Sequence, residues 1–477
     1  MLESYPIYIN GRWLETENKL DVVDKFSGEV FARVSVSGEA EVDAAVSAAL
    51  EAFRQSPLPP YRRYEILAKG SALLAERVDE LALTITREAG KVLKDAKTEV
   101  LRAAQVLQIA AEEAKRITGE MIPVEAAPGA ENRLAYTVRV PIGVVCAISP
   151  FNFPLNLACH KVAPALAAGN TVVFKPSSAT PISGINICRI LEEAGLPPGY
   201  LNLVVGGGNE VGDLLLRDER IAFYSFTGSA KVGKRIMATV GLRKATMELG
   251  SNSVTIVHKD ADLEKAAAAC SRMPFVNAGQ VCISIQRLLV HRDIYERFTE
   301  MLAAKTRELV LGNPLDADTD LGPMISEAEA IRAETWVKAA LAGGATLVSG
   351  GKRRGALFEP TILTNVEPEM KVVCEEVFAP VVSVIPYDDF DEAVKMTNAS
   401  KYGLQAGVFT SSIEIANKAA RELEVGGVIV NDTSVYRADQ TPYGGVKESG
   451  NGREGPKYAI QEMTEPKLVV FNLDVLS

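Results

Sequence analysis

Residues 141–176 read "PIGVVCAISPFNFPLNLACHKVAPALAAGNTVVFKP" and supply a strand, a helix and a second strand in succession. The runs "IGVVCAIS" (142–149) and "TVVFKP" (171–176) are short, apolar and rich in β-branched residues. The Ala- and Leu-rich segment between them is predicted to be helical near residues 156–168. A strand, a helix and a strand of these lengths are typical of a parallel sheet in an α/β fold.

The same alternation extends beyond this unit. Segments with Ala, Leu and charged residues at helical spacing fill the region from Glu39 to Ile117. Toward the C-terminus, strand-like runs alternate with amphipathic segments in two blocks, before and after Leu249. These runs are "YLNLVV", "IAFYSF", "SVTIVH", "RLLVH", "PVVSVIPY", "AGVFT" and "GGVIVN". We therefore predict an α/β protein of two lobes, the first built on a doubly wound parallel sheet.

Composition narrows the class of partner. The chain has 477 residues, 47% of them hydrophobic, which suffices for two or three domains with substantial cores. Its 61 acidic residues outnumber its 51 basic ones, and a net charge of −10 argues against a nucleic-acid-binding surface. We expect small molecules as partners.

Neither membrane insertion nor export is predicted. The most apolar stretch, residues 140–160, is interrupted by Pro141, Pro150 and Pro154 and falls short of the ~20 apolar residues that span a bilayer. The N-terminal "MLESYPIYINGRW" lacks the apolar centre of a secretory signal. The cysteines show no CxxC or CxxxC spacing, which favours neither a metal site nor a disulfide framework, and we expect a reducing, cytoplasmic location. They are Cys146, Cys159, Cys188, Cys270, Cys282 and Cys374.

Cys282, in "NAGQVCISIQ" (277–286), is a candidate nucleophile. By residue type alone, a free cysteine is more often a small buried hydrophobe. The three histidines, His160, His258 and His291, lie in a helix-like run and at two strand ends, so none is a convincing base for it. Glu248 in "KATMELGSNS" is an alternative base, because partial burial raises the pKa of a carboxyl group. The competing interpretation of Glu248 is the polar side of a strand.

Several loops after predicted strands carry groups that suit a ligand. Asn152, between two aromatics and two prolines in "ISPFNFPLN", offers a rigid amide donor for a developing oxyanion, although most loop asparagines simply form Asx-turns. Lys175 ends a strand where a doubly wound sheet has its ligand crevice, although such lysines are usually solvated. In "YSFTGSAKVG", Gly228 permits a tight turn and Ser229 can cap a helix that attracts a pyrophosphate. The glycines of residues 206–212 have the wrong spacing for a phosphate loop and are weak evidence.

Taken together, these motifs resemble the NAD(P)-dependent aldehyde dehydrogenase superfamily, in the family's order and from "YINGRW" to "GGVKESGNGREG". The resemblance implies that "PFNFP" carries an oxyanion-binding Asn152, "MELGSN" a general base Glu248, and "GQVC" the nucleophile Cys282. The Cys282 thiolate would attack an aldehyde, and Asn152 with the Cys282 backbone N–H would hold the oxyanion. Hydride transfer would leave a thioester, which water activated by Glu248 would hydrolyse, so no histidine is required.

The resemblance also implies a nicotinamide dinucleotide site. "FTGS" corresponds to a pyrophosphate loop at Gly228 and Ser229, and "KP" to a ribose-binding Lys175. "EEVFAP" supplies Glu376, expected to hold the nicotinamide ribose, and Phe378, expected to pack near the ring.

One departure from the family bears on the choice of cofactor. Many NAD-preferring relatives have "KPAE" where this chain has "KPSS", so Ser178 replaces a carboxylate that would bind ribose hydroxyls and repel a 2′-phosphate. With Ser178 at this position and Lys175 nearby, we expect NADP to be preferred over NAD. Ser251 after "ELG" and Ala379 in "FAP" also depart from the usual glycines, without touching the chemistry.

The substrate is predicted from two arginines. Arg437, in "DTSVYRADQTPYGG", lies in the stretch that lines the family's substrate tunnel, and Arg102 lies on a helix that can reach it. Two guanidinium groups favour a small anionic or hydroxylated aldehyde, unless they serve salt bridges elsewhere. Val281 stands where relatives acting on glyceraldehyde 3-phosphate have arginine, so the lactaldehyde and semialdehyde dehydrogenase-like branches are the better match.

The family fold implies a Rossmann-like cofactor domain, an α/β catalytic domain and a bridging β-hairpin that pairs across subunits. The strand-like runs near 131–141 and at the C-terminus fit the hairpin, and we expect a homodimer or homotetramer. The predicted parts are a cofactor domain (1–118 and 141–248), a catalytic domain (249–433, with 434–463 returning to the active site) and oligomerisation strands (119–140 and 464–477).

Three alternatives remain open from sequence. A CoA-acylating aldehyde dehydrogenase keeps the fold but commonly lacks the base, whereas Glu248 is present. A thiol esterase or acyltransferase without a redox step would need neither the "FTGS" nor the "KP" element. A catalytically silent relative would not need Cys282, Glu248 and Asn152 together.

Overall fold

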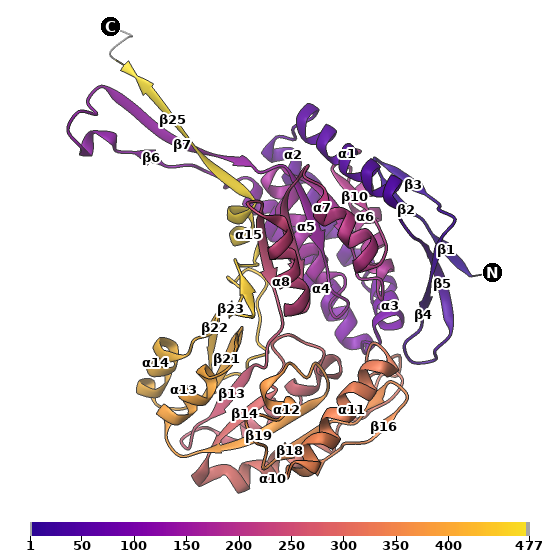
Figure 1. The fold of residues 1–477 in the computed structure, drawn as a ribbon, viewed down its shortest axis with the longest axis vertical. Coiled ribbons are helices and arrows are strands. Elements are labelled where there is room, and N and C mark those ends of the chain that lie inside the picture. Colours follow the sequence, from indigo (N-terminus) through magenta and orange to yellow (C-terminus); the bar gives the residue numbers. More distant parts are fainter. Residues whose placement is uncertain (1, 474–477) are drawn as a thin grey trace.

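The computed structural model describes residues 2–473 and contains two α/β bodies and a projecting β-ribbon (Figure 1). The first body is built on an eight-stranded sheet in the order β24-β12-β11-β8-β9-β10-β2-β3. Its five central strands are parallel, and the added strands β2 and β24 run antiparallel to their neighbours. The strands are β2 (Ile7–Ile9), β3 (Arg12–Leu14), β8 (Val144–Ile148), β9 (Thr171–Lys175), β10 (Leu201–Leu203), β11 (Ile221–Thr227), β12 (Lys244–Glu248) and β24 (Gly450–Asn451).

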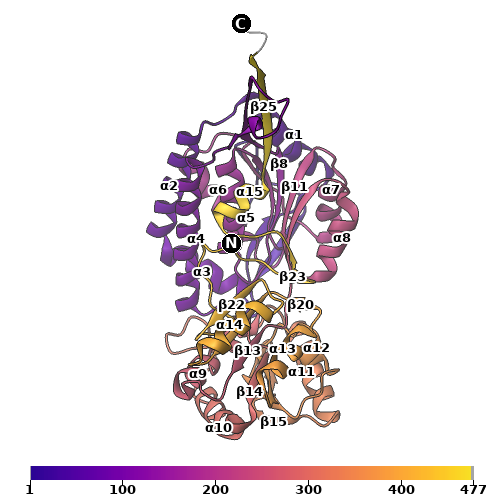
Figure 2. The same cartoon turned by 90° about the vertical axis from the view of Figure 1, so that its left-hand side faces the viewer.

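Helices cover both faces of this sheet, as Figure 2 shows for α2 and α4 on one side and α8 on the other. This arrangement confirms the predicted doubly wound fold. The helices are α1 (Glu39–Gln55), α2 (Pro60–Glu76), α3 (Val78–Ala89), α4 (Leu93–Ala114), α5 (Asn156–Ala168), α6 (Pro181–Glu193), α7 (Asp213–Arg217), α8 (Ala230–Val240) and α15 (Pro456–Glu462). A small sheet of β1 (Glu3–Tyr5), β5 (Val30–Ser35) and β4 (Lys19–Val23) and a π-helix at Gly208–Gly212 complete the body.

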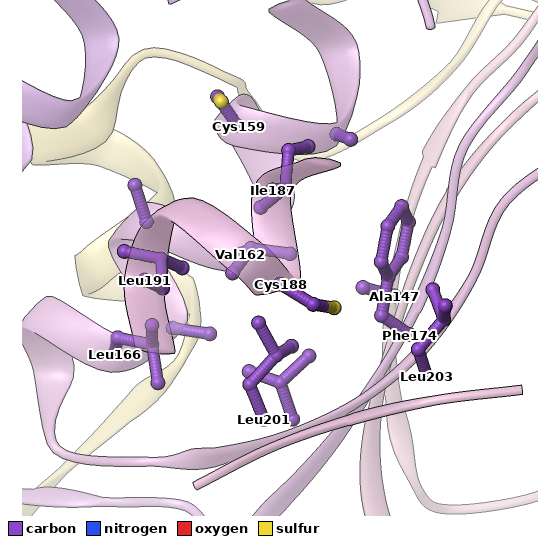
Figure 3. Packing of buried hydrophobic residues seen from close by; sticks show 14 of the residues in the cluster. Ala147, Cys159, Val162, Leu166, Phe174, Ile187, Cys188, Leu191, Leu201 and Leu203 are labelled. Carbon is purple, nitrogen blue, oxygen red and sulfur yellow. The ribbon is translucent and has the colours of Figure 1, made fainter. Parts of the chain in front are cut away.

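The core beneath these helices explains why strands of consecutive apolar residues form here. Phe174 and Cys188 are fully buried between β9 and α6, and Figure 3 shows them packed with Val162 and Leu201. Burying each large apolar side chain stabilises the fold by about 1.5–3 kcal/mol. All six cysteines are free thiols, and four of them are buried as small hydrophobes. Cys282 and Cys374 are the two that are only half-buried.

The second body is a seven-stranded sheet in the order β15-β18-β19-β14-β13-β21-β22, parallel except for the edge strand β15. Its strands are β13 (Val254–Val257), β14 (Arg287–His291), β15 (Thr346–Ser349), β18 (Thr361–Thr364), β19 (Val381–Tyr387), β21 (Gln405–Phe409) and β22 (Gly427–Val430). Its helices are α9 (Leu263–Cys270), α10 (Tyr295–Thr306), α11 (Glu327–Ala342), α12 (Lys371–Cys374), α13 (Phe390–Asn398) and α14 (Ile413–Glu422). Two small ribbons pair β16 (Arg353–Arg354) with β17 (Leu357–Phe358) and β20 (Tyr402–Gly403) with β23 (Val446–Lys447).

The two strands without partners in sequence pair with each other. β25 (Thr464–Asn472) runs antiparallel to β7 (Arg133–Pro141), and β6 (Met121–Ile122) adds a third strand. This ribbon projects from the first body in Figure 1 and leaves Leu468 and Val470 of β25 about half exposed. Residues 474–477 of the predicted C-terminal strand lie outside the described residues. None of the helices between residues 2 and 473 is both long and apolar enough to cross a bilayer.

Candidate active site

A cleft of about 1160 Å³ lies where the carboxyl ends of the first sheet's strands meet the second body. The loops after β8, β9 and β11 form one wall, as expected for a ligand crevice in a doubly wound sheet. Cys282, Glu376 and Phe378 of the second body line the other wall. A smaller cavity of about 170 Å³ adjoins it, and Cys282 lines both.

Backbone geometry explains how Cys282 reaches this junction. The preceding residues Asn277, Ala278 and Gly279 have φ values of 52°, 54° and 70°, which place a left-handed turn directly before the cysteine loop. A Cβ atom at Gly279 would lie 2.1 Å from the Ala379 carbonyl oxygen, so this turn requires glycine. The turn sends the half-buried Cys282 side chain toward Tyr443, with 2.8 Å between Sγ and the phenol oxygen.

The Cys282 thiol is neutral in the resting protein near pH 7. Burial raises its pKa to about 11, against the opposing effects of the Tyr443 hydroxyl and the Arg437 guanidinium. Since the thiolate is the nucleophilic form, attack by Cys282 requires a base to take its proton. His160, His258 and His291 are engaged elsewhere, the first with Asp439 and the other two with a ring cluster around Tyr387.

Glu248 ends β12 as a buried carboxyl group, 3% exposed. Within residues 2–473 neither of its oxygens has a hydrogen-bond partner, which leaves both for a ligand or water. A Cβ atom at Gly444 would lie 2.7 Å from Oε1, so glycine there makes room for the carboxylate. Burial, followed by the charge of Glu454, raises the pKa of Glu248 well above its usual range.

Glu454 is a second buried carboxylate with the opposite behaviour. It accepts hydrogen bonds from Lys161 at 2.9 Å and from Arg437 at 2.8 Å. Although burial opposes ionisation, these two cations hold the pKa of Glu454 below its usual range. Neighbouring carboxyl groups whose environments push their pKa values apart are typical of sites that perform acid–base chemistry, here with Glu248 as the group able to exchange a proton.

Asn152 and the Cys282 backbone amide offer hydrogen-bond donors, and both residues line the large cleft. Asn152 is 4% exposed, and its Nδ2 donates to the Gln280 carbonyl at 2.9 Å, which fixes the amide and leaves its second N–H. Asn277 in turn donates to the Asn152 carbonyl at 3.1 Å, so the loop is held from both sides. In the described chain no protein group accepts a hydrogen bond from the Cys282 backbone N–H. The two free donors suit an oxyanion.

The smaller cavity contains both arginines singled out by sequence, Arg102 and Arg437. Each is also ion-paired: Arg102 donates to both oxygens of Asp439 at 3.0 and 2.7 Å, and Arg437 binds Glu454. Arg437 Nε is buried without a partner in the described chain, and so is the Oδ1 atom of Asn156, another lining residue. Both arginines therefore line the cavity even though each is ion-paired, and the salt bridges fix their positions there.

The cleft contains the six residues predicted to bind a dinucleotide, which are Lys175, Ser178, Gly228, Ser229, Glu376 and Phe378. Lys175 is 6% exposed, and its best acceptor is the Pro176 carbonyl at 3.4 Å, so its ammonium group has capacity for a ligand. Burial lowers the pKa of Lys175. Ser178 Oγ donates to the Gly206 carbonyl at 2.8 Å.

Gly228, Ser229 and Glu376 also line the cleft. Ser229 is the N-cap of α8 and accepts from the Val232 amide at 3.4 Å, as its position predicted. Gly228 has an ordinary φ; it is needed because a Cβ atom would lie 2.5 Å from the Phe226 ring. Glu376 accepts from the Ser251 amide at 3.0 Å, and burial raises its pKa to about 7.

Sequence reasoning did not single out several residues of the site. Tyr443 lies in "DTSVYRADQTPYGG", the stretch that lines the family's substrate tunnel, and the signal that could mark it is an aromatic residue beside paired glycines. Lys231, at the start of α8, lines the cleft with Ser229 and adds a cation beside that helix terminus. The acidic partners Asp439 and Glu454 could have been sought, because buried arginines require counter-charges.

The comparisons with known proteins agree with this geometry. The model of the Aldehyde dehydrogenase family matches residues 13–469. The chain is 54% identical over 472 residues to the 3-sulfolactaldehyde dehydrogenase of Priestia aryabhattai, covering 99% of each. It superposes with a TM-score of 0.97 at 41% identity on aldehyde dehydrogenase 21 of Physcomitrella patens in complex with the reaction product succinate, covering 99% of each chain. It superposes with a TM-score of 0.92 at 41% identity on glyceraldehyde-3-phosphate dehydrogenase GapN of Methanocaldococcus jannaschii complexed with NADP. This match covers 96% of the present chain and 100% of that chain.

Proposed function

Because the chain belongs to the aldehyde dehydrogenase family, we propose that it oxidises a small anionic aldehyde to the carboxylic acid with NADP as oxidant. The observation that carries this proposal is the position of Cys282, which lines both the large cleft and the small arginine-containing cavity. An aldehyde bound in the small cavity would have its carbonyl carbon at Cys282. A nicotinamide ring bound in the large cleft would then lie beside the same carbon.

The residues support a two-stage reaction in which Cys282 forms a covalent intermediate. The Cys282 thiol first releases its proton to solvent water. The Sγ lone pair then forms a bond to the aldehyde carbon, and the carbonyl electron pair becomes an oxyanion that accepts from Asn152 and the Cys282 N–H. Loss of hydride leaves a thioester. Water then adds to the thioester, Glu248 takes a water proton, and the C–S bond breaks to release the acid. Overall, aldehyde, water and oxidised cofactor give carboxylate, reduced cofactor and two protons.

Two features of the cleft suit a nicotinamide dinucleotide: its positively charged groups and the glycines that leave space along its walls. Lys175 and the N-terminus of α8 offer positive charge, and Gly228 lets a ligand approach the turn before that helix. A Cβ atom at Gly250 would lie 2.2 Å from Glu376, so glycine there lets this carboxylate lie in the cleft wall to accept from a ribose hydroxyl. When bound, the nicotinamide ring supplies the hydride acceptor.

The preference for NADP is proposed from charge. Ser178 places no carboxylate near the adenosine ribose, while Lys175 and Lys231 line the same cleft. A 2′-phosphate is favoured by cations and disfavoured by an acidic neighbour. The relative from M. jannaschii is described in complex with NADP, which supports the choice.

The anionic substrate is proposed from Arg102 and Arg437. Guanidinium groups bind sulfonate, carboxylate and phosphate oxygens through paired N–H donors. Two of the relatives named above support an anionic substrate, because one is named for 3-sulfolactaldehyde and the other is described with the reaction product succinate. Val281 beside the nucleophile is apolar, which favours a short lactaldehyde-like or semialdehyde chain over glyceraldehyde 3-phosphate.

We further propose the division into parts predicted from sequence, with the ribbon joining copies into a homodimer or homotetramer. Exposed apolar residues along β25 support that contact. Six free cysteines support a reducing, cytoplasmic location.

A panel of aldehydes tests the proposal, with NADPH formation followed at 340 nm. It should include lactaldehyde, 3-sulfolactaldehyde, succinate semialdehyde, glyceraldehyde 3-phosphate and a long alkanal. We expect the small anionic aldehydes to have the highest kcat/KM, and the free acid to accumulate without CoA. Release of an acyl-CoA only when CoA is added would favour the acylating alternative. Ester hydrolysis without any aldehyde oxidation would favour the thiol esterase.

A further inference from the structure

We propose that Tyr443 is a further catalytic residue, whose hydroxyl group donates a hydrogen bond to the Cys282 sulfur whenever that sulfur carries negative charge. This inference rests on the proposed function, because it assigns a role at the same sulfur. The phenol oxygen lies 2.8 Å from Sγ, within hydrogen-bond distance of the sulfur.

The surroundings hold the Tyr443 ring in place. Its backbone forms a two-way bridge with Glu454, with N–O distances of 3.1 and 2.6 Å. The Arg437 guanidinium lies 3.7 Å from the ring centroid, on the face of the ring. Val281 and Ile283 pack around it, and only 4% of the residue is exposed. The hydroxyl group is thus aimed at the sulfur by a rigid frame.

Two consecutive residues, Tyr443 and Gly444, contact the two proposed reacting groups, Cys282 and Glu248. Tyr443 contacts the sulfur, and the next residue, Gly444, provides the space that Glu248 occupies. A phenylalanine at position 443 would fill the same volume and keep the contact with Arg437. The hydroxyl group is therefore what the sulfur contact requires, rather than the bulk of the ring.

Sulfur carries negative charge at two stages of the reaction, and the phenol can respond at both. When Cys282 loses its proton to solvent water, the O–H group donates to the thiolate and the phenol keeps its proton. When the C–S bond forms, sulfur loses that charge to the carbonyl oxygen. When water displaces sulfur from the thioester, the electron pair of the C–S bond returns to sulfur, and Tyr443 again donates to the departing thiolate. Burial raises the pKa of Tyr443 well above its usual range, so the phenol acts as a donor and not as an acid.

Alkylation of Cys282 by iodoacetamide tests the inference in the protein without substrate or cofactor. The rate is measured against pH from the mass of the peptide containing Cys282, in the wild type and in Tyr443→Phe. The groups that influence the sulfur are Tyr443, Arg437, Glu376 and Glu248, and this variant changes one of them. We expect the pH midpoint of alkylation to rise by about one unit, the effect of losing one hydrogen bond to a charged group. We also expect kcat to fall with little change in either KM.

Tyr387→Phe is the matched control, because it removes a buried phenol that bonds His258 away from both cavities. It should leave the midpoint unchanged. An unchanged or lowered midpoint in Tyr443→Phe would overturn the role of Tyr443. If that variant is unstable, 3-fluorotyrosine at position 443 keeps the ring and donates more strongly, and the midpoint must then fall. Failure of the proposed function itself is distinguishable, because the wild type would then form no NADPH from any aldehyde of the panel, whereas the alkylation midpoints of the wild type and Tyr443→Phe would still differ.

Discussion

Arg437 and Glu454 form a buried ion pair at the edge of the small cavity, with 2.8 Å between Nη2 and Oε2 and side chains 8% and 4% exposed. The same carboxylate holds Lys161 and influences Glu248. A substitution at Arg437 therefore alters the charge around the proposed base as well as the substrate cavity. Removing one partner of such a pair typically costs about 3–5 kcal/mol, because a buried charge is left alone.

Arg102→Gln is the cleaner test of an anionic substrate. Arg102 is 27% exposed, and its partner Asp439 keeps a hydrogen bond from His160 at 2.9 Å. We expect kcat/KM for 3-sulfolactaldehyde and succinate semialdehyde to fall by one to two orders of magnitude, equivalent to about 1.5–3 kcal/mol. Neutral lactaldehyde should be much less affected. Equal losses for charged and neutral aldehydes would remove Arg102 from substrate binding.

The pH dependence of kcat tests the coupling between Glu248 and Glu454. Glu248 must be ionised to accept a proton, and its pKa is raised, so kcat should fall with decreasing pH earlier than for an ordinary carboxyl group. Glu454→Gln removes a neighbouring negative charge while Lys161, Arg437 and Arg453 keep their positive charges. The pKa of Glu248 should drop, and the acid limb of the kcat profile should move to lower pH.

Glu448→Gln provides the comparison, because Glu448 pairs with Lys234 on the surface at 2.6 Å. The acid limb of the kcat profile of Glu448→Gln should coincide with that of the wild type. A limb that stays in place in Glu454→Gln, or moves to higher pH, would be inconsistent with charge repulsion between the two buried carboxyl groups.

Cofactor choice is tested by Ser178→Glu. The new carboxylate would lie in the cleft with Lys175 and Lys231, where the 2′-phosphate is proposed to bind. We expect kcat/KM for NADP to fall at least about tenfold because of like-charge repulsion, with NAD affected little. Steady-state rates with both cofactors measure this. A wild-type enzyme that already prefers NAD by a large factor would refute the proposal before any variant is made.

The strands, the helices and the motif residues could be predicted from the sequence, because they depend on local patterns of residues. The run of 141–176 predicts two strands and a helix because apolar periodicity depends on neighbours in the chain, and β8, α5 and β9 form there. Tyr443 and Cys282 are 161 positions apart, so their contact depends on the tertiary fold and not on local pattern. The ion pairs of Arg102 and Arg437 involve Asp439 and Glu454 in irregular loops, where no periodicity marks a partner.

The proposed contact between copies through the ribbon is tested by combining Leu468→Lys with Val470→Lys. Both side chains are exposed on β25, 59% and 49%, and two charges there should prevent burial against another copy. We expect the mass in solution, measured by light scattering after gel filtration, to fall to that of a smaller assembly. An unchanged mass would place the contact between copies elsewhere.

The central claim is that Cys282 and Glu248 act on one carbon atom in successive steps, and Glu248→Gln tests it most directly. Mixed rapidly with aldehyde and NADP, this variant should produce one NADPH per active site and then stall. The added mass of the acyl group should be found on Cys282. Continued turnover at the wild-type rate, or a stalled enzyme with Cys282 unmodified, would contradict the account.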